Sequence, residues 1–287
     1  MTPMSFPFLR AMEKPKRSIN RMETPAPLAQ LPENLSAERV LEVQHYTDRL
    51  FRFTIARPAS FRFRAGEFVM IGLRTADRPL MRAYSIASAP SAEALEFYSI
   101  IVPDGPLTSR LCRIKPGDEV LMARKATGTL VLDALTPAAR LFLVSTGTGF
   151  APFASILREP ETYAKFKQVI VTHTCRDAAE LRYSADVVNA LPDDPLVGEA
   201  AAFHVMRYAT CTRGSCQRRG RITDLMQSGK AFADMGIAPL SPAHDRVMIC
   251  GSLGFNHDMQ ALLMRAGFTE GSNAAPGEFV VEKAFVG

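Results

Sequence analysis

Three side chains in one short run could hold a ligand that carries both a phosphate and a flat ring. The run is Arg82-Ala83-Tyr84-Ser85. An arginine binds phosphate with two parallel N–H groups, a tyrosine ring packs against another ring, and a serine hydroxyl forms hydrogen bonds. A flavin dinucleotide is such a ligand. Taken alone, the run is more ordinary as a half-buried strand, in which arginine keeps its charge in water and tyrosine packs.

A second candidate phosphate site follows the turn at Gly105-Pro106. We expect a short helix over residues 106–111, and the N–H groups and hydroxyls at its start would attract an anion. Thr108 and Ser109 are therefore candidate ligands of a pyrophosphate. They could instead only cap the helix, which is the simpler interpretation of this motif alone.

A glycine-rich turn lies between an apolar run and a helix in the second half of the chain. Gly147-Thr148-Gly149 follows the apolar residues 140–145, and a helix begins near Phe153. Glycines at such a turn let backbone amides approach a pyrophosphate. Pro152 stands where the third glycine of the dinucleotide fingerprint would be, and the first helical turn tolerates it. The turn is a candidate dinucleotide loop.

Three further polar segments follow apolar strands, at residues 173–176, 210–213 and 250–253. In open α/β sheets, ligands bind beyond those carboxyl ends. Arg176, Arg213 and Arg221 are candidate phosphate ligands. Because no acidic residue stands at the ribose position of the second strand, they favour NADP over NAD. The spacing is equally compatible with a solvated basic loop over residues 213–221.

Two patterns of elements must position these groups. From residue 37, short alternating segments between Gly and Pro turns predict an antiparallel β-barrel or sandwich. Beyond a boundary near 136–139, apolar strands alternate with helices, which predicts βαβ units and a parallel sheet. We expect barrel strands at 39–45, 50–56, 67–73, 82–87, 95–102 and 119–123, sheet strands at 140–145, 168–174, 202–208 and 246–250, and helices at 178–190 and 257–266.

The positive charge of the chain is concentrated at its start. The formal net charge is +5, and residues 1–22 hold five basic residues and one acidic residue, a local net of +4. Subtracting 4 from 5 leaves +1 for the rest, which argues against a nucleic-acid partner. Residues 1–36 are expected to be a disordered tail or a targeting segment, with Met22 as an alternative start.

Cysteine usage and hydropathy favour a cytoplasmic chain with no metal site and no stable membrane association. Five cysteines form an odd set without a convincing secretory signal, which favours reduced thiols. Only Cys211 and Cys216 lie close together, and no neighbouring cysteine or histidine completes a zinc or iron–sulfur pattern. The longest apolar runs fall far short of the ~18 residues that a membrane span needs.

Taken in order, the motifs resemble the ferredoxin–NADP reductase family, most closely its bacterial type. The resemblance covers residues 37–287 and implies an FAD-binding barrel domain over 37–137 and an NADP-binding α/β domain over 138–287. The motifs that carry it are Arg82-Ala83-Tyr84-Ser85, Phe97-Tyr98-Ser99-Ile100, Gly105-Pro106-Leu107-Thr108-Ser109-Arg110-Leu111, Gly147-Thr148-Gly149-Phe150-Ala151-Pro152, Cys250-Gly251-Ser252 and Val281-Glu282-Lys283-Ala284-Phe285-Val286-Gly287.

In the first domain, the resemblance implies a role in flavin binding for residues of three segments. Arg82, Thr108 and Ser109 would hold the pyrophosphate. Tyr84 would lie against the isoalloxazine, and Ser85 would lie close to flavin N5. The other implied flavin contacts, which include the strand on the adenosine side, are Ala83, Tyr98, Ser99, Ile100 and Leu107.

In the second domain, the resemblance places Thr148 and Gly149 beside the nicotinamide. Cys250 and Glu282 would place nicotinamide C4 over flavin N5, with Ser85 and Glu282 as a polar pair. Cys250 could instead be a buried structural thiol, as its apolar strand suggests. The candidate catalytic residues are thus Ser85, Cys250 and Glu282, and the other implied nucleotide contacts are Arg176, Thr212, Arg213, Arg221 and Gly251.

The chain departs from the family pattern at two places. Plant-type members end in a tyrosine that stacks on the flavin, whereas Ala284 stands at that place here and Phe285 follows. As in bacterial relatives, this tail is expected to fold over the cofactor. Thr212-Arg213 is followed by Gly214 and the Cys- and Arg-rich segment 215–219, where relatives usually carry an acidic residue.

The activity that the resemblance implies is hydride transfer between NADPH and FAD, coupled to one-electron exchange with a ferredoxin or flavodoxin, in a cytoplasmic monomer. Two alternatives remain open. The chain could be the reductase component of an oxygenase, although such chains often carry a fused ferredoxin domain with a Cys-rich motif. It could also be a non-catalytic flavin relay subunit that never meets nicotinamide.

Overall fold

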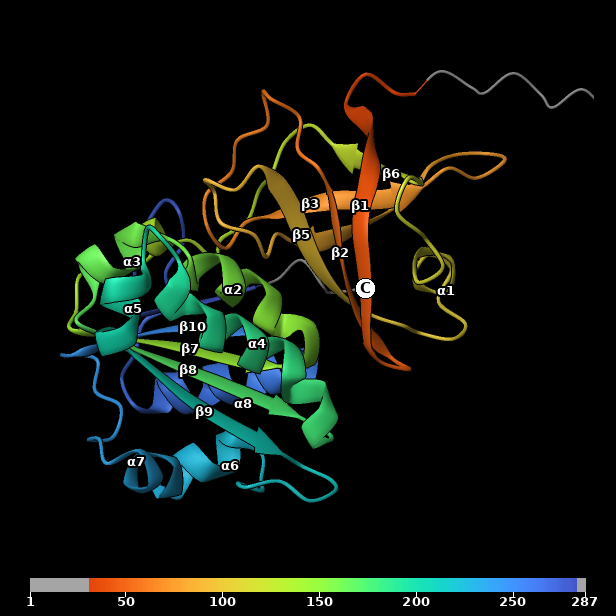
Figure 1. Cartoon of the computed structure of the whole chain (residues 1–287). Helices are drawn as coiled ribbons and strands as arrows, with labels where there is room; N and C mark the ends of the chain where they lie inside the picture. Colours follow the sequence, from red (N-terminus) through yellow and green to blue (C-terminus); the bar gives the residue numbers. More distant parts are fainter. Residues whose placement is uncertain (1–30, 283–287) are drawn as a thin grey trace, which may run out of the picture. The chain divides into compact units, whose positions relative to one another are not determined.

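The computed structural model describes residues 31–282. The tail expected over residues 1–30 and the flavin contacts expected of Ala284 and Phe285 lie outside the described residues. Within the described part of the chain, the residues from Glu33 onward belong to one compact unit, which is described by itself below. It contains an antiparallel sheet followed along the chain by a parallel one, as the sequence predicts (Figure 1).

The first sheet has six antiparallel strands in the order β4-β3-β6-β1-β2-β5. Ile86, just past β4, bridges Phe97 of β5 and so brings the two ends of this order together. The predicted barrel is therefore confirmed. Its strands are β1 Leu35–Thr47, β2 Leu50–Ala56, β3 Phe68–Leu73, β4 Leu80–Ser85, β5 Ala94–Ile100 and β6 Glu119–Ala123.

The first strand begins earlier than its sequence pattern predicts. Leu35 pairs with Ala123 of β6, so Leu35 and Ser36, which we expected in the tail, belong to the sheet. Alternation along the strands then fills the barrel. In β2, Phe51, Phe53 and Ile55 are fully buried, whereas the residues between them are partly exposed.

The second sheet has five parallel strands in the order β11-β10-β7-β8-β9. The sequence predicts four of them and misses β11, which has three residues and is too short to show a period. Its strands are β7 Arg140–Thr146, β8 Gln168–Cys175, β9 Val205–Cys211, β10 Asp245–Cys250 and β11 Phe279–Val281.

The strand predicted over residues 202–208 is wrong at its start. Ala202 to His204 belong to helix α5, Gly198–His204, and the strand begins at Val205. The reason is the run Ala200-Ala201-Ala202, because alanine has the highest helix propensity of all residues.

Helices cover both faces of the second sheet (Figure 1). Leu141 and Leu143 of β7 pack in one apolar cluster and Phe142 and Val144 in another, as expected for a strand buried on both sides. The first cluster lies under α2 Ala151–Leu157, α3 Pro160–Lys165, α4 Arg182–Ala190 and α5, and the second under α6 Ile222–Gln227, α7 Lys230–Met235 and α8 Leu253–Arg265. No helix within residues 31–282 is long and apolar enough to cross a membrane.

Candidate active site

A cavity of about 750 Å³ opens beside β4 and β5. It brings together all the residues expected to bind flavin that the structure describes, except Ser109, and it also contacts Thr148 and Ala151 of the parallel-sheet domain. Thr108 opens the short helix α1, Thr108–Leu111, which confirms the helix expected there. The expected residues that line the cavity are Arg82, Ala83, Tyr84, Ser85, Tyr98, Ser99, Ile100, Leu107 and Thr108.

Tyr84 belongs to the barrel core and also lines the cavity. Its ring packs edge-on against Phe53 and Phe97, at centroid distances of 6.2 and 6.3 Å. Its hydroxyl lies 3.2 Å from Ser99 Oγ, and burial raises the pKa of Tyr84. Arg82, in contrast, is exposed and donates only to the neighbouring Met81 carbonyl within the described residues. A buried ring and an exposed cation therefore lie two residues apart on β4.

Two buried hydroxyls of this cavity, Ser85 Oγ and Tyr98 Oη, have no hydrogen-bond partner among residues 31–282. Buried polar atoms in native proteins are nearly always paired. A polar ligand in the cavity would supply the missing partners, so the lining fits a flavin. Burial raises the pKa of Tyr98 and keeps its phenol protonated, able to donate.

A second cavity, of about 720 Å³, lies at the carboxyl ends of the parallel strands. It shares Ile100 and Thr148 with the first cavity. Because β7 lies between β10 and β8, the tips of β10 and β7 form one part of the lining and those of β8 and β9 another. The first part contains the expected residues Thr148, Gly149, Cys250 and Gly251, and the second contains Arg176, Thr212, Arg213 and Arg221.

The glycine-rich turn is fixed by contacts with neighbouring strands. Gly147 has φ +53°, a backbone conformation that glycine adopts without strain. A Cβ on Gly149 would lie 2.1 Å from the Cys250 carbonyl oxygen. Gly149 is therefore required for the β7 turn to approach the tip of β10, a role that the dinucleotide pattern did not reveal.

Cys250 and Glu282 are neighbours at the ends of β10 and β11. Burial, and then the charge of Glu282, raise the pKa of the Cys250 thiol well above its usual value. The Glu282 N–H donates to the Ile249 carbonyl at 3.0 Å, and Asn256 Nδ2 donates to the Glu282 carbonyl at 3.2 Å. Because Ser85 Oγ has no hydrogen-bond partner in the described chain, it is not bonded to Glu282, and their joint role stays a prediction.

In the part of the second cavity that contains the arginines, two backbone hydrogen bonds join the ends of β9 and β8. The Thr212 N–H donates to the Cys175 carbonyl at 3.0 Å, and the Arg213 N–H donates to the Arg176 carbonyl at 2.7 Å. Both arginine side chains are exposed. Arg221 forms an ion pair with Asp258 at 3.2 Å, also exposed to solvent.

One expectation about the cysteines is wrong. Cys211 and Cys216 form a disulfide, so reduced thiols are not found at this pair. Cys112, Cys175 and Cys250 are free. A separation of five residues is too weak a pattern to reveal the bond, whereas the turn after β9 brings the two Cα atoms to 6.2 Å, a usual distance for a disulfide.

His173 is a functional candidate that the sequence did not single out. It is almost fully buried on β8, where Nε2 lies 2.8 Å from the Gly147 carbonyl and Nδ1 lies 2.8 Å from Ser184 Oγ. Burial lowers the pKa of His173 to about 4, so the imidazole is neutral near pH 7. The only sequence signal is a polar residue within an apolar strand.

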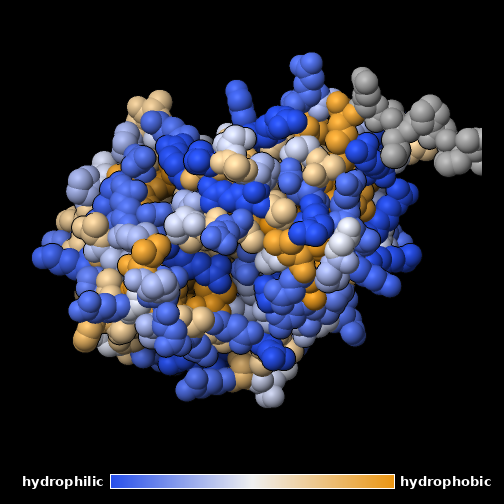
Figure 2. Space-filling model, turned by 45° about the horizontal axis from the view of Figure 1, so that its top comes forward, coloured by the Kyte–Doolittle hydropathy of each residue, from blue (hydrophilic) through white to orange (hydrophobic). Residues whose placement is uncertain are grey.

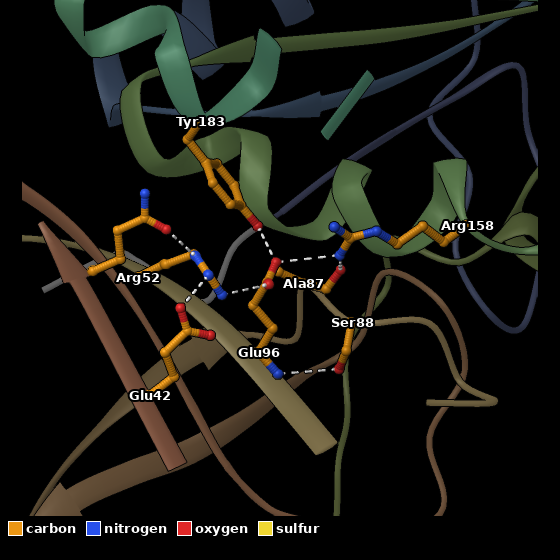
Figure 3. Close-up of polar contacts among 8 residues, drawn as sticks. Glu42, Arg52, Ala87, Ser88, Glu96, Arg158 and Tyr183 are labelled. Atoms are coloured by element: carbon orange, nitrogen blue, oxygen red, sulfur yellow. Dashed lines mark hydrogen bonds and ion pairs between the residues drawn. The ribbon is translucent and has the colours of Figure 1, made fainter. Parts of the chain in front are cut away.

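The two domains meet at a carboxylate that is only partly exposed, that of Glu96. Glu96 of β5 accepts a hydrogen bond from Tyr183 Oη of α4 at 2.6 Å (Figure 3). Arg158, which follows α2, donates to Glu96 at 3.2 Å and to the Ala87 carbonyl at 2.9 Å. Arg52 of β2 lies 3.3 Å from the second oxygen of Glu96. Charge-assisted bonds of this kind are stronger than neutral ones. Those from Tyr183 and Arg158 therefore hold α4 and the end of α2 against the barrel.

An antiparallel barrel with a flavin-sized cavity, followed by a parallel sheet with a second cavity at its strand ends, defines a flavin-dependent oxidoreductase that uses a nicotinamide nucleotide. Family models agree with this class. An oxidoreductase FAD-binding domain matches residues 38–130, and an oxidoreductase NAD-binding domain matches residues 143–261. FAD is thereby confirmed, as is a nicotinamide dinucleotide, the class of cofactor to which the predicted NADP(H) belongs.

Individual relatives narrow the class to a family. The chain is 55% identical over 263 residues to a flavodoxin/ferredoxin–NADP reductase of Rhodobacter capsulatus, covering 91% of this chain and 96% of the relative. It is 48% identical over 254 residues to a ferredoxin–NADP reductase of Pseudomonas aeruginosa, covering 88% and 98%. This chain belongs to the ferredoxin–NADP reductase family and is an FAD-dependent oxidoreductase.

A solved structure supports the same assignment. A ferredoxin–NADP reductase of Neisseria gonorrhoeae, determined with bound FAD and NADP, has a TM-score of 0.80 and 30% sequence identity, covering 88% of this chain and all of the other. The predicted family and fold class are therefore confirmed.

Proposed function

We propose that the protein transfers hydride between NADPH and bound FAD, and that it exchanges single electrons with a ferredoxin or flavodoxin. The observation that carries this proposal is the meeting of two cavities at Ile100 and Thr148. When bound, flavin accepts two electrons as hydride and passes them on one at a time. The chain supplies binding, orientation and exclusion of water.

On the flavin side, we assign the pyrophosphate to Arg82, Thr108 and Ser109. Arg82 is exposed and able to swing onto a phosphate, and Thr108 lines the cavity. Ser85 offers the ring an unpaired buried hydroxyl. The other flavin contacts we assign are Ala83, Tyr84, Tyr98, Ser99, Ile100 and Leu107, together with Ala284 and Phe285 as a cover.

On the nicotinamide side, we assign Thr148, Gly149 and Gly251 to binding and Cys250 to shaping the pocket wall. A thiol with a raised pKa stays protonated and neutral beside the dihydronicotinamide ring of NADPH, which is also uncharged. Glu282, anchored by its backbone next to Cys250, is assigned to holding the nicotinamide in position. Hydride transfer requires reacting atoms at about 3–3.5 Å. A pocket wall formed by the buried Cys250 would hold the nicotinamide ring at that distance from the flavin.

We assign the adenosine 2′-phosphate to Arg176, Thr212, Arg213 and Arg221. All four line the second cavity, and guanidinium groups bind phosphate in a bidentate manner. This arrangement favours NADPH over NADH. One cation is already partly neutralised, because Arg221 pairs with Asp258.

We also propose a monomer, located in the cytoplasm, where cellular thiol reductants would act on the Cys211–Cys216 disulfide. The large apolar side chains exposed within residues 31–282 come from different elements, among them Leu41 of β1, Phe203 of α5 and Met264 of α8. On the face drawn in Figure 2, apolar side chains form several separate groups among hydrophilic ones. Stable interfaces need a larger contiguous patch. Size-exclusion chromatography with light scattering would test the monomer.

Anaerobic stopped-flow spectroscopy tests the assigned chemistry. Flavin absorbance should bleach on mixing with NADPH, and Cys250→Ala and Glu282→Gln should slow this phase, whereas Cys112→Ser, in the barrel domain, should not. An unchanged rate in both site variants would contradict the assigned roles. A flavin that never bleaches would identify a relay subunit instead.

Cytochrome reduction tests the partner. With NADPH as donor, added ferredoxin or flavodoxin should increase the rate of cytochrome reduction, and NADH should support a lower rate. If neither carrier increases the rate but an oxygenase component does, the chain is an oxygenase reductase.

A further inference from the structure

The disulfide Cys211–Cys216 closes a loop that contains Thr212 and Arg213. We have assigned these two residues to the 2′-phosphate, and the inference below depends on that assignment. The disulfide itself has no part in the reaction described above. Its position raises the question of what the cross-link does for the nucleotide site.

The first end of the loop is tied to the sheet. Cys211 is fully buried as the last residue of β9. The next two residues donate their N–H groups to the tip of β8, Thr212 to Cys175 and Arg213 to Arg176. The backbone of Arg213 is thus placed beside Arg176, and the exposed segment begins directly after it.

The second end of the loop returns to the same place. The Cys211 N–H donates to the Arg218 carbonyl at 3.1 Å, and the Gly220 N–H donates to the Cys211 carbonyl at 3.0 Å. The Arg218 guanidinium lies 5.0 Å from the centroid of the Tyr208 ring, a cation–π distance. Both ends are therefore anchored on Cys211.

Between these anchors, the chain is polar and open to solvent. Gly214 and Ser215 are exposed, and Gly214 has φ +60°. Few buried apolar contacts are available to hold such a segment. A covalent bond from Cys216 back to the buried end of β9 limits how far Arg213 can move.

We propose that this cross-link is a specificity-determining element, which holds Thr212 and Arg213 in place for the adenosine 2′-phosphate. A site that is ordered before binding loses less conformational entropy when the ligand arrives. The benefit applies only to a ligand that contacts the loop. The cross-link thus increases affinity for NADPH and leaves NADH, which has no 2′-phosphate, unaffected.

A dithiol reductant opens the cross-link by a balanced exchange. One thiolate of the reductant attacks a cysteine sulfur, the Cys211–Cys216 bond breaks, and a mixed disulfide forms. The second thiolate then displaces the protein. The reductant leaves as a cyclic disulfide, and Cys211 and Cys216 each gain a proton as thiols. Attack should begin at Cys216, which is partly exposed, because Cys211 is buried.

Thiol counting under denaturing conditions tests whether the cross-link exists in solution. The untreated holoprotein should show three free thiols, from Cys112, Cys175 and Cys250, and five after dithiol treatment. Five free thiols without reductant would overturn the inference at its first step.

Steady-state kinetics with NADPH and NADH test the role. Cys216→Ser, or dithiol treatment of the wild type, should raise the KM for NADPH roughly three- to tenfold, the effect of ordering one long side chain. The kcat for NADPH and the KM for NADH should not change. Reoxidation should restore the wild type, and Cys112→Ser should behave as wild type throughout.

A variant of Arg213 separates this inference from the assignment beneath it. Arg213→Ala should lower the NADPH preference even in the cross-linked protein. If Arg213→Ala changes the preference but reduction does not, the cross-link has no role in specificity. If neither changes it, the 2′-phosphate site itself is wrongly assigned.

Discussion

Removal of one hydroxyl at the domain contact should measurably destabilise the protein. Tyr183→Phe deletes the group that donates to Glu96 at 2.6 Å. The ring itself remains stacked on Tyr98, with centroids 4.1 Å apart, so apolar burial hardly changes. Burial, and then the negative charge of Glu96, raise the pKa of Tyr183 well above its usual value. The phenol is therefore a donor at every pH used for assay.

The size of the destabilisation depends on which hydrogen bonds the Glu96 carboxylate retains in the variant. Its side chain is only 14% exposed, so it cannot recover the lost bond from water in full, although Arg158 and Arg52 still donate to it. A hydrogen bond to a charged group contributes about 1.5–3 kcal/mol. With two donors remaining, we expect the lower end, a loss of about 1.5 kcal/mol in the free energy of unfolding, or about 3–6 °C in Tm.

Tyr163→Phe is the matched control. Its hydroxyl also donates at 2.6 Å, but to the neutral Leu157 carbonyl, so about 1 kcal/mol should be lost. Urea unfolding of the holoprotein, followed by circular dichroism and flavin fluorescence, measures both variants. A loss for Tyr183→Phe no larger than that for Tyr163→Phe would refute the idea that the charged acceptor makes this contact strong.

Two further predictions concern the turn after β7 and the histidine that contacts it. Gly149→Ala places a Cβ 2.1 Å from the Cys250 carbonyl oxygen and should abolish most NADPH turnover, whereas Gly147→Ala, with open space around its Cβ but φ +53°, should cost about 1 kcal/mol by thermal unfolding. If the two variants lose the same fraction of NADPH turnover, the close approach of Gly149 to Cys250 is not the constraint. His173 has its native pKa lowered to about 4, below the unfolded value of ~6.5, so the unfolded chain binds more protons as pH falls. Stability should drop by about 2 kcal/mol between pH 7 and pH 5 from this residue, and His173→Asn should flatten that part of the profile.

The sequence predicts the order of elements well because hydrophobic period and turn residues are local properties. Runs of five to seven residues identified four of the five parallel strands. Strand β11 escaped because three residues, Phe279 to Val281, show no period and are ordered by pairing with β10. Leu35 and Ser36 escaped for the same reason, since pairing with β6 rather than their own pattern makes them a strand.

Residues of the site were predictable where they belong to contiguous motifs. The runs Arg82 to Ser85 and Gly147 to Gly149 were predicted as ligand-binding segments from their sequences alone, and each run lines a cavity in the structure. His173, Asn256 and Glu96 could not, because their roles come from partners 26 or more residues away or in the other domain. The Cys211–Cys216 bond depends likewise on a turn geometry that spacing alone does not reveal.

The position of strand β11 in the chain determines when the second domain can complete its fold during synthesis. It pairs with β10, and its side chains Phe279 and Val281 complete an apolar cluster with helices α6 to α8. A nascent chain that has not yet released these residues presents the edge of β10 unpaired, and open edges invite association with other chains. The nucleotide-binding half is thus closed by a strand that follows all its other elements along the chain. A ribosome that stalls or stops before Phe279 would produce a chain with a complete barrel and an aggregation-prone second domain.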